Sequence, residues 1–199
     1  INNHAKTISE KSNLFLPWSE SKYLKPKKYN LRNVILYFGY INRLNMDLIL
    51  KIAKKGFRIR FVGPILGNGK KIKSLLENYE KIEFKKQVDS LNDLNLNDVY
   101  CSAAFYDTNI SGINAVTASN RMFKLLSFGI PLIYPKLPNL INAPDNVIKQ
   151  CDSVSDFVNS FKFFSENFYL IQHDIKLFLK GNYKIDRKDQ LKKFLNNLN

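Results

Sequence analysis

Short apolar runs alternate with amphipathic stretches along most of this sequence, and turn residues separate them. Residues 33–38 (NVILYF) have the composition of a buried strand and end at Gly39. Residues 46–55 carry apolar side chains at helical spacing and stop before Gly56. The same patterns predict strands over 57–62, 81–84, 98–106 and 131–134, and helices over 70–79, 89–95, 120–128 and from 153 onward. Strands that alternate with helices need crossover connections, so the sequence predicts an α/β fold with a doubly wound, Rossmann-like parallel sheet.

The length of 199 residues fits one domain with short additions at its ends. We expect a linker segment over residues 1–30, in which 14–18 (LFLPW) look like a strand, a Rossmann-like domain over 31–182, and a basic C-terminal helix over 183–199. The sequence begins at Ile1 rather than at a methionine, which suggests a piece of a longer protein. Its two cysteines, Cys101 and Cys151, have no zinc or redox spacing, which is typical of a reduced, cytoplasmic protein.

The net charge of +14 is the unusual feature of the composition, with 31 Lys and Arg against 17 Asp and Glu. Such an excess predicts an anionic partner: a phosphorylated ligand, an acidic membrane surface or a nucleic acid. A chain rich in lysine and asparagine for compositional reasons would carry the same charge without any function, and both interpretations stay open. No nucleic-acid motif is present, so we disfavour nucleic acid as a partner.

Ligands of open parallel sheets bind at the carboxyl ends of the strands, so the loops that follow the strands are the candidate sites. In the loop after residues 33–38, Gly39 allows close approach of the backbone to a ligand, and Asn42 and Arg43 follow it. Arg43 has the charge to neutralise a phosphate. A turn glycine followed by an exposed arginine that binds no ligand would give the same sequence. The loop over 63–71 is glycine-rich but fails the P-loop spacing, so we expect a flexible connection there.

The loop over 106–119 leads into a helix predicted to begin at Asn120. A helix start after a strand offers free N–H groups to a diphosphate, and Arg121 adds positive charge in the first turn. Arg121 and Lys124 share one face of this helix. A core helix with solvated basic residues is the alternative. Two local features have plain structural explanations: Asp107 is expected to form an Asx turn with Asn109, and a packing stripe is expected at Phe157, Phe161, Phe164 and Phe168.

The segment NRMFKLLSFGIPLI, residues 120–133, resembles the donor-binding signature of GT-B glycosyltransferases of the group-1, family-four-like type, which often read NKLFEYLAAGKPVV. The likeness extends to residues 33–53 as the opening strand, glycine turn and helix of the second lobe, and to FRIRFVGP, residues 57–64, as the next strand. Residues 81–106 resemble the part that holds the nucleobase loop, and 14–21 the segment between the lobes. The resemblance covers roughly residues 30–150, and 14–21 precede that range.

This resemblance implies the C-terminal, donor-binding lobe of a two-lobed enzyme. Its implied donor-binding residues are Gly39, Asn42, Arg43, Val88, Ser119, Asn120, Arg121 and Lys124. Gly39 would lie near the donor phosphates, Ser119, Asn120 and Arg121 would face the diphosphate, and the backbone near Gln87 and Val88 would meet the base. The leaving diphosphate would be stabilised by Arg121 and the helix start rather than by a metal. Consistently, the chain has no Asp-x-Asp pair, and we expect no metal and no cofactor beyond a nucleotide-sugar, with a UDP-sugar favoured.

Two positions depart from the pattern of retaining members, which carry two glutamates where this chain has Val116 and Lys124. A lysine does not accept hydrogen bonds from ribose hydroxyls. The catalytic residues, the stereochemistry and turnover itself therefore stay open.

The predicted function is sugar transfer from a nucleotide-sugar to a cell-surface polysaccharide or glycolipid acceptor, together with an N-terminal lobe in the same chain or in a partner. A degenerate lobe without turnover and a non-catalytic basic module that binds nucleic acid or anionic membrane are the alternatives. We expect a cytoplasmic location. The basic helix near Lys184–Lys193 would either contact the inner face of the membrane or be a solvated end.

Overall fold

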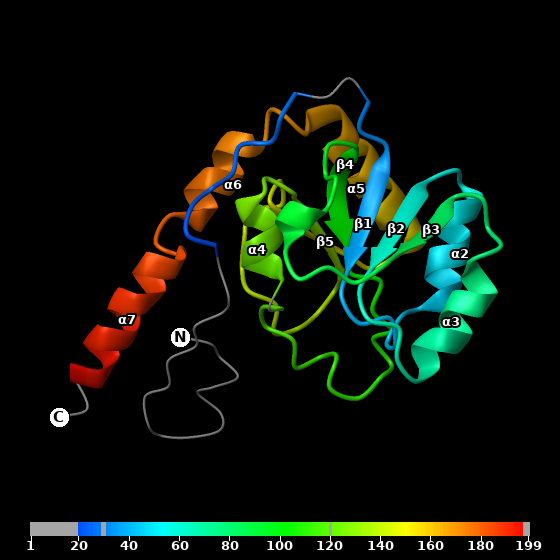
Figure 1. Cartoon of the computed structure of the whole chain (residues 1–199), viewed down its shortest axis with the longest axis horizontal. Coiled ribbons are helices and arrows are strands. Elements are labelled where there is room, and N and C mark those ends of the chain that lie inside the picture. The colour runs from blue at the N-terminus through cyan, green and yellow to red at the C-terminus, as the bar shows by residue number, and fades with distance from the viewer. Residues whose placement is uncertain (1–19, 29–30, 120, 197–199) are drawn as a thin grey trace.

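A six-stranded parallel sheet forms the centre of the protein (Figure 1). The computed structural model describes residues 20–28, 31–119 and 121–196. The strand order is β3-β2-β1-β4-β5-β6, and every neighbouring pair is parallel. The strands are β1 (Val34–Phe38), β2 (Arg58–Val62), β3 (Ile82–Lys85), β4 (Val99–Ala103), β5 (Leu132–Pro135) and β6 (Ile148–Cys151). The predicted α/β, doubly wound, Rossmann-like sheet is therefore confirmed.

Helices flank the sheet on both sides because the direction of the crossovers changes between β1 and β4 (Figure 1). They are α2 (Met46–Lys54), α3 (Asn68–Leu76), α4 (Met122–Ser127), α5 (Val154–Asn167), α6 (Gln172–Leu179) and α7 (Lys184–Asn196), with a short 3-10 turn at Leu91–Asp93. Helix α5 packs on β4, β6 and α2, and α4 packs on β5 and α6. Among the helices of the described residues, none is long and apolar enough to cross a membrane.

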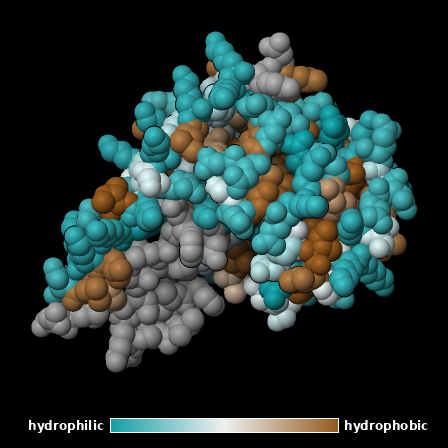
Figure 2. Space-filling view, viewed as in Figure 1, coloured by the Kyte–Doolittle hydropathy of each residue, from teal (hydrophilic) through white to brown (hydrophobic). Residues whose placement is uncertain are grey.

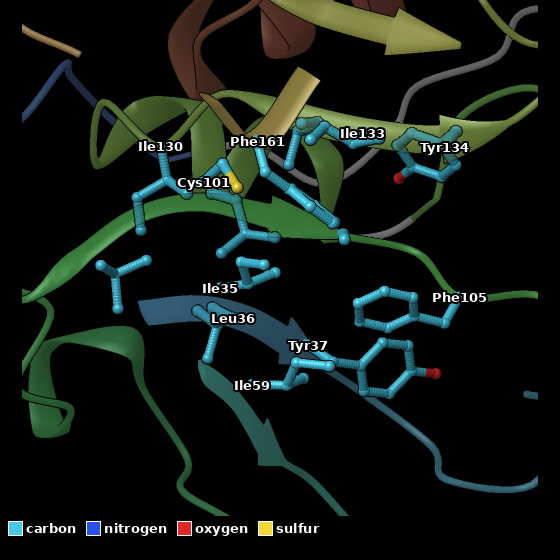
Figure 3. Packing of buried hydrophobic residues seen from close by; sticks show 14 of the residues in the cluster. Ile35, Leu36, Tyr37, Ile59, Cys101, Phe105, Ile130, Ile133, Tyr134 and Phe161 are labelled. Carbon is cyan, nitrogen blue, oxygen red and sulfur yellow. The ribbon is translucent and has the colours of Figure 1, made fainter. Parts of the chain in front are cut away.

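The central strands and the helix faces explain why these residues form these elements. In β1 and β4 nearly every side chain is buried, as expected for strands covered on both faces. Helix α2 begins where the Asn45 side chain accepts a hydrogen bond from the Leu48 N–H at 2.9 Å, and ends before Gly56, whose φ is +90°. Figure 3 shows Ile35, Leu36 and Tyr37 of β1 among the other buried side chains of the core.

The phenylalanine stripe of α5 is confirmed as packing. Phe157, Phe161 and Phe164 are buried, as is Phe168 just beyond the helix. The rings of Phe157 and Phe105 stack with centroids 6.2 Å apart, so α5 is held to the segment that follows β4. The helix itself begins at a capping box, in which Ser153 and Asp156 exchange side-chain and backbone hydrogen bonds.

Several predicted elements differ in extent. The predicted helix over 89–95 is only the 3-10 turn at Leu91–Asp93, and its N-cap is Ser90 rather than Asp89. The predicted strand over 98–106 ends at Ala103, and α3 already begins at Asn68, within the segment expected to be a flexible connection. Strand β6 was not predicted, because its middle residues, Lys149 and Gln150, are polar and lie on the edge of the sheet.

The segment over 20–28 is attached to the C-terminal helices and to α4. The Leu24 N–H donates to the Ser127 carbonyl at 2.6 Å, and the Lys184 N–H donates to the Glu20 carbonyl at 3.0 Å. Helix α7 lies within the predicted basic C-terminal segment. The proposed boundaries at 30 and 182 stay predictions, and the predicted strand over 14–18 lies outside the described residues.

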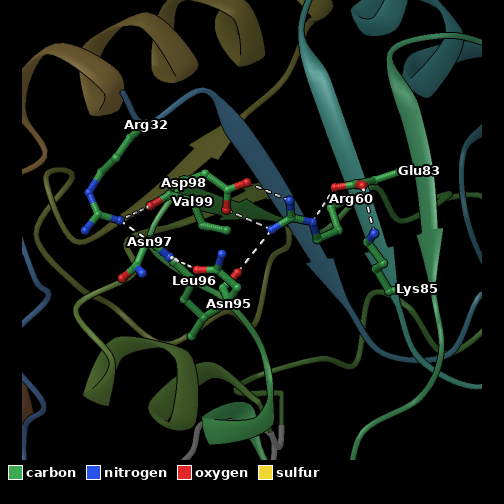
Figure 4. Close-up of polar contacts among 9 residues, drawn as sticks. All are labelled: Arg32, Arg60, Glu83, Lys85, Asn95, Leu96, Asn97, Asp98 and Val99. Atoms are coloured by element: carbon green, nitrogen blue, oxygen red, sulfur yellow. Dashed lines mark hydrogen bonds and ion pairs between the residues drawn. The ribbon is translucent and has the colours of Figure 1, made fainter. Parts of the chain in front are cut away.

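A polar cluster joins the middle of β2 with β3 and with the start of β4 (Figure 4). The Arg60 guanidinium binds both oxygens of Asp98, at 2.8 and 2.6 Å, and also pairs with Glu83. The side chains of Arg60 and Asp98 are only 11% and 22% exposed. Burial alone would raise the pKa of Asp98, but the hydrogen bonds and charge of Arg60 outweigh burial and hold that pKa below its ordinary value.

Replacing Asp98 by Asn should lower the free energy of unfolding near neutral pH by about 1–3 kcal/mol, because Arg60 then loses its bidentate partner. Since the folded pKa of Asp98 is depressed, the pair stabilises the fold above the unfolded pKa of about 4 and loses this effect as pH falls below it. Urea unfolding at pH 7 and pH 3 should show a smaller pH dependence in Asp98→Asn than in the wild type. The exposed pair Lys136–Asp152 is the control, and Asp152→Asn should change stability by less than about 0.5 kcal/mol.

Candidate functional site

The carboxyl ends of β1 and β4 meet at the place where the strand order reverses. In doubly wound sheets, this switch point is where the connecting loops diverge and leave a crevice for a ligand. The loop after β1 and both ends of the long connection from β4 to α4 reach this edge. The candidate site is therefore built from backbone and side chains of these two connections.

The loop after β1 is held in place from both sides by backbone hydrogen bonds. The Gly39 N–H donates to the Val62 carbonyl of β2 at 2.8 Å. At its other end, the Asn45 N–H donates to the Phe105 carbonyl, just beyond β4, at 2.8 Å. The loop is thus anchored to both neighbours of β1 before any ligand arrives.

Gly39 lies in close contact with two other segments. Its φ is +142°, a conformation that side-chain-bearing residues rarely adopt, and a Cβ at Gly39 would overlap the Arg121 guanidinium. Gly63, with φ +151°, comes equally close, because a Cβ there would overlap the Gly39 carbonyl. These two glycines allow the ends of β1 and β2 and the start of α4 to meet without side chains between them.

The Arg121 guanidinium occupies the end of β1. Its Nη1 donates to the Phe38 carbonyl, its Nη2 lies 3.4 Å from the Tyr106 hydroxyl, and its Cζ lies 5.3 Å from the centre of the Tyr37 ring. None of these groups carries a negative charge near neutral pH. Within the described residues, the contacts of this partly buried cation are therefore neutral, an arrangement that favours the arrival of an anion.

Three tyrosines, Tyr37, Tyr106 and Tyr134, line the space beside Arg121. The Tyr134 hydroxyl lies 2.7 Å from the Ser119 hydroxyl, and the Tyr37 hydroxyl donates to the Tyr40 carbonyl at 2.6 Å. Burial raises the pKa of Tyr134 and of Tyr37, so both phenols stay neutral. They belong to a small pocket lined by Tyr37, Phe38, Ser102, Ala103, Ala104, Tyr106, Arg121, Leu125, Leu132 and Tyr134.

The structure brings some of the predicted residues together. Gly39 and Arg121 are in contact, Ser119 lies beside Tyr134 two residues before Arg121, and Lys124 is partly buried in the first turn of α4. Asn42 and Arg43 lie in the turn after Gly39 with exposed side chains.

Two predicted residues stand apart from this group. Val88 follows the edge strand β3, two strands away from β1 in the sheet order, and Asn120 lies outside the described residues. Whether any of the predicted residues contacts a donor stays a prediction.

Helix α4 is shorter than expected. It spans Met122–Ser127 instead of 120–128, and Arg121 stands at the N-cap position without a side-chain cap hydrogen bond. Six residues give a weak helix dipole, because the dipole is the sum of the aligned peptide units. The positive charge at this site therefore comes mainly from the Arg121 guanidinium.

Tyr37, Tyr106 and Tyr134 were not predicted as site residues, although the candidate loop over 106–119 begins at Tyr106. Tyr106 and Tyr134 had each been placed at the last position of a predicted strand, and those ends share one edge of a parallel sheet. That shared edge was the signal that their side chains would lie together, and their ring centroids are 6.2 Å apart. Asp107, by contrast, forms the predicted Asx turn, with its Oδ1 accepting from the Asn109 N–H at 3.0 Å.

No cluster of three or more His, Cys, Asp or Glu side chains in the described part of the chain is arranged to hold a metal ion. The expectation of metal-independent chemistry is not tested by this finding and stays a prediction.

No model of a protein family matches the sequence, and no curated protein matches it. Solved structures do match. Staphylococcus aureus TarM, in a complex that includes UDP, superimposes with a TM-score of 0.65 at 11% identity, covering 96% of this chain and 40% of TarM.

Two further structures match over most of this chain. The catalytic domain of the Helicobacter pylori cholesterol-α-glucosyltransferase gives a TM-score of 0.50 at 18% identity, covering 75% of this chain and 96% of that domain. BGT of phage T4, in complex with UDP-glucose, gives 0.51 at 16% identity, covering 88% of this chain and 50% of BGT. All three are GT-B glycosyltransferases, and this chain spans only about 40% of TarM and half of BGT.

These superpositions show the fold, while the sequence identities are low. The chain has the fold of one lobe of a GT-B glycosyltransferase, as the resemblance in sequence indicated. The family-four-like assignment stays a prediction.

Replacing Gly39 by Ala should destabilise the protein by about 1–3 kcal/mol, because a Cβ at this φ is strained and overlaps Arg121. In an Arg121→Ala background the overlap with the guanidinium is removed, so the same change should cost less. A double-mutant cycle followed by urea unfolding should give a coupling energy of about 1 kcal/mol or more. Strictly additive costs would show that the two residues do not touch.

Proposed function

We propose that this chain is the donor-binding lobe of a glycosyltransferase and binds a nucleoside diphosphate at Gly39 and Arg121. The observation that carries the proposal is a partly buried guanidinium whose contacts among the described residues are neutral, set against the backbone of Gly39 at the switch point of the sheet. A diphosphate supplies the missing negative charge. Its oxygens also match the fork of N–H donors that a guanidinium presents.

Arg121 also has a role in the transfer of the sugar. When the bond between the anomeric carbon of the sugar and the diphosphate oxygen breaks, the electron pair stays on the diphosphate. A cation already positioned at this oxygen stabilises the developing charge without reorganisation. In this proposal Arg121 exchanges its contact with the neutral Phe38 carbonyl for one with the charged leaving group.

We further propose that the complete enzyme contains more than this lobe. An N-terminal lobe, in the same chain or a partner, supplies acceptor binding, and the acceptor is a cell-surface polysaccharide or glycolipid. A UDP-sugar is the donor we favour, supported by the UDP and UDP-glucose found in the TarM and BGT structures. No metal or further cofactor is required, nucleic acid is not a partner, and the location is cytoplasmic.

A second candidate is a lobe that binds a nucleotide without turnover. It is favoured by Lys124 and Val116, which stand where retaining family-four-like enzymes carry glutamates. Lys124 provides no acceptor for ribose hydroxyls but does provide a cation for phosphate. The two candidates share the nucleotide site and differ in catalysis, so sugar release from a UDP-sugar by the complete two-lobed protein distinguishes them.

Thermal unfolding with UDP, GDP, ADP, dTDP and uridine at two salt concentrations tests the shared site. A ligand at a hundredfold excess over its Kd should add about 2.7 kcal/mol, a shift of about 5–10 °C. We expect a base-selective shift with UDP that persists at the higher salt concentration. Arg121→Ala should weaken UDP binding about 10- to 100-fold and leave uridine binding unchanged, because only the phosphate contact is lost.

Arg58→Ala is the matched control, since Arg58 is an exposed arginine at the amino end of β2, on the opposite edge of the sheet. It should bind UDP like the wild type. Arg43→Ala tests the exposed turn separately, and a loss of UDP affinity there would add Arg43 to the site. Equal UDP affinity in Arg121→Ala and the wild type would refute the proposed placement.

A further inference from the structure

Helix α7 carries three of its lysines and its three large aliphatic side chains on one side. At 3.6 residues per turn, the spacing of four, three and four residues puts Lys184, Lys188, Leu191 and Leu195 on one side. Ile185 and Lys192, seven residues apart, lie along one edge of this row. Asp186 lies on the opposite side of the helix, and Asp189 borders the edge that Ile185 and Lys192 form. We call the first set the basic–apolar stripe: Lys184, Ile185, Lys188, Leu191, Lys192 and Leu195.

All six residues of the stripe are exposed, and no residue of α7 is buried. The side chains of Ile185, Leu191 and Leu195 are 59%, 43% and 51% exposed, which is unusual for three large aliphatic residues on one short helix. Figure 2 shows hydrophobic side chains interleaved with hydrophilic ones along α7, at the extended end of the molecule.

Another side of α7 holds the helix to the body of the protein. The Arg187 guanidinium lies 5.1 Å from the centre of the Phe123 ring of α4 and donates to the Asn182 side chain. The Gln190 side chain donates to the Gly181 carbonyl at 3.0 Å. The contact of Arg187 with Phe123 turns this side of α7 toward the body, and the residues of the basic–apolar stripe are left exposed.

We infer that the basic–apolar stripe of α7 docks onto an anionic lipid surface, where the helix lies along the plane of the membrane. Aliphatic side chains enter the boundary between headgroups and acyl chains, while lysines extend along it and place their ammonium groups among lipid phosphates. The net charge of +14 adds long-range attraction to the same surface. Thirteen residues span about 20 Å, enough for an interfacial helix.

A protein partner fits this stripe less well. The buried centre of a protein interface is depleted in lysine, and each lysine placed there needs a partner charge. Here three lysines alternate with the three aliphatic residues. Among the ion pairs of the described residues, none involves Lys184, Lys188 or Lys192. Lipid phosphates supply these charges without requiring a complementary arrangement of acids.

Flotation of the full 199-residue chain with vesicles tests this inference. We expect binding to vesicles that contain phosphatidylglycerol and phosphatidylcholine, and much weaker binding to phosphatidylcholine alone. The triple variant Lys184→Gln, Lys188→Gln, Lys192→Gln should lose roughly fivefold in partitioning for each lysine, about a hundredfold in all. The matched control changes three exposed lysines at the end of α2, Lys51, Lys54 and Lys55, to Gln, and should keep most of the binding.

The apolar half of the stripe is tested by Ile185→Ser, Leu191→Ser and Leu195→Ser together, which should reduce vesicle binding by at least about tenfold. No residue of α7 is buried, so thermal unfolding of both triple variants should stay close to that of the wild type. Absence of binding to anionic vesicles overturns the inference. Unchanged vesicle binding by the serine variant also overturns it, because the aliphatic side chains then contribute nothing. So does a 20-base-pair DNA duplex that binds the chain as tightly as the vesicles do and loses affinity equally in both lysine variants, because that result shows a general attraction of polyanions.

Discussion

The close approach of Arg121 to the backbone at the end of β1 is the constraint on which the candidate site depends. It exists because Gly39 and Gly63 have no Cβ, and it brings a cation to the switch point of the sheet. The loop after β1 is anchored to β2 on one side and to the segment after β4 on the other. The Arg121 guanidinium, which comes from the start of α4, therefore rests against the anchored end of β1.

The environment of Arg121 explains why a phosphate ligand suits the site. A partly buried cation loses hydration, and here the Phe38 carbonyl, the Tyr106 hydroxyl and the Tyr37 ring replace only part of it. The neutral phenols beneath it provide polarity without competing negative charge. An anion with several oxygens completes this arrangement, and in sugar transfer the anion gains charge as the sugar leaves.

Much of the fold was predictable from the sequence because its signals are local. The apolar pattern of residues 33–38 predicted a strand, and that of 46–55 predicted a helix. The structure has β1 and α2 there with nearly the same bounds. Strand β6 was missed because Lys149 and Gln150 at a sheet edge give no apolar run. The pairing of Arg60 with Asp98 was also unpredictable, since 38 positions separate the two residues and the contact arises only from strand order.

The candidate site was predictable in part. The resemblance placed Gly39 and Arg121 at one site, and the structure brings them into contact. The contact of Arg121 with the Phe38 carbonyl and the grouping of Tyr37, Tyr106 and Tyr134 around one pocket depend on three-dimensional packing. Helix α4 then links the candidate site to the C-terminal helices, because Phe123, two residues after Arg121, contacts Arg187 of α7.

The most direct measurement of the central claim is a titration of the ¹⁵N-labelled chain with UDP, followed through the backbone amides and the arginine Nε–H signals at low and higher salt. The account predicts saturable changes at Gly39, Gly63 and the Arg121 Nε–H that persist as salt rises. Changes confined to exposed lysine-rich surfaces and lost at the higher salt, with the Arg121 signal unmoved, would contradict it.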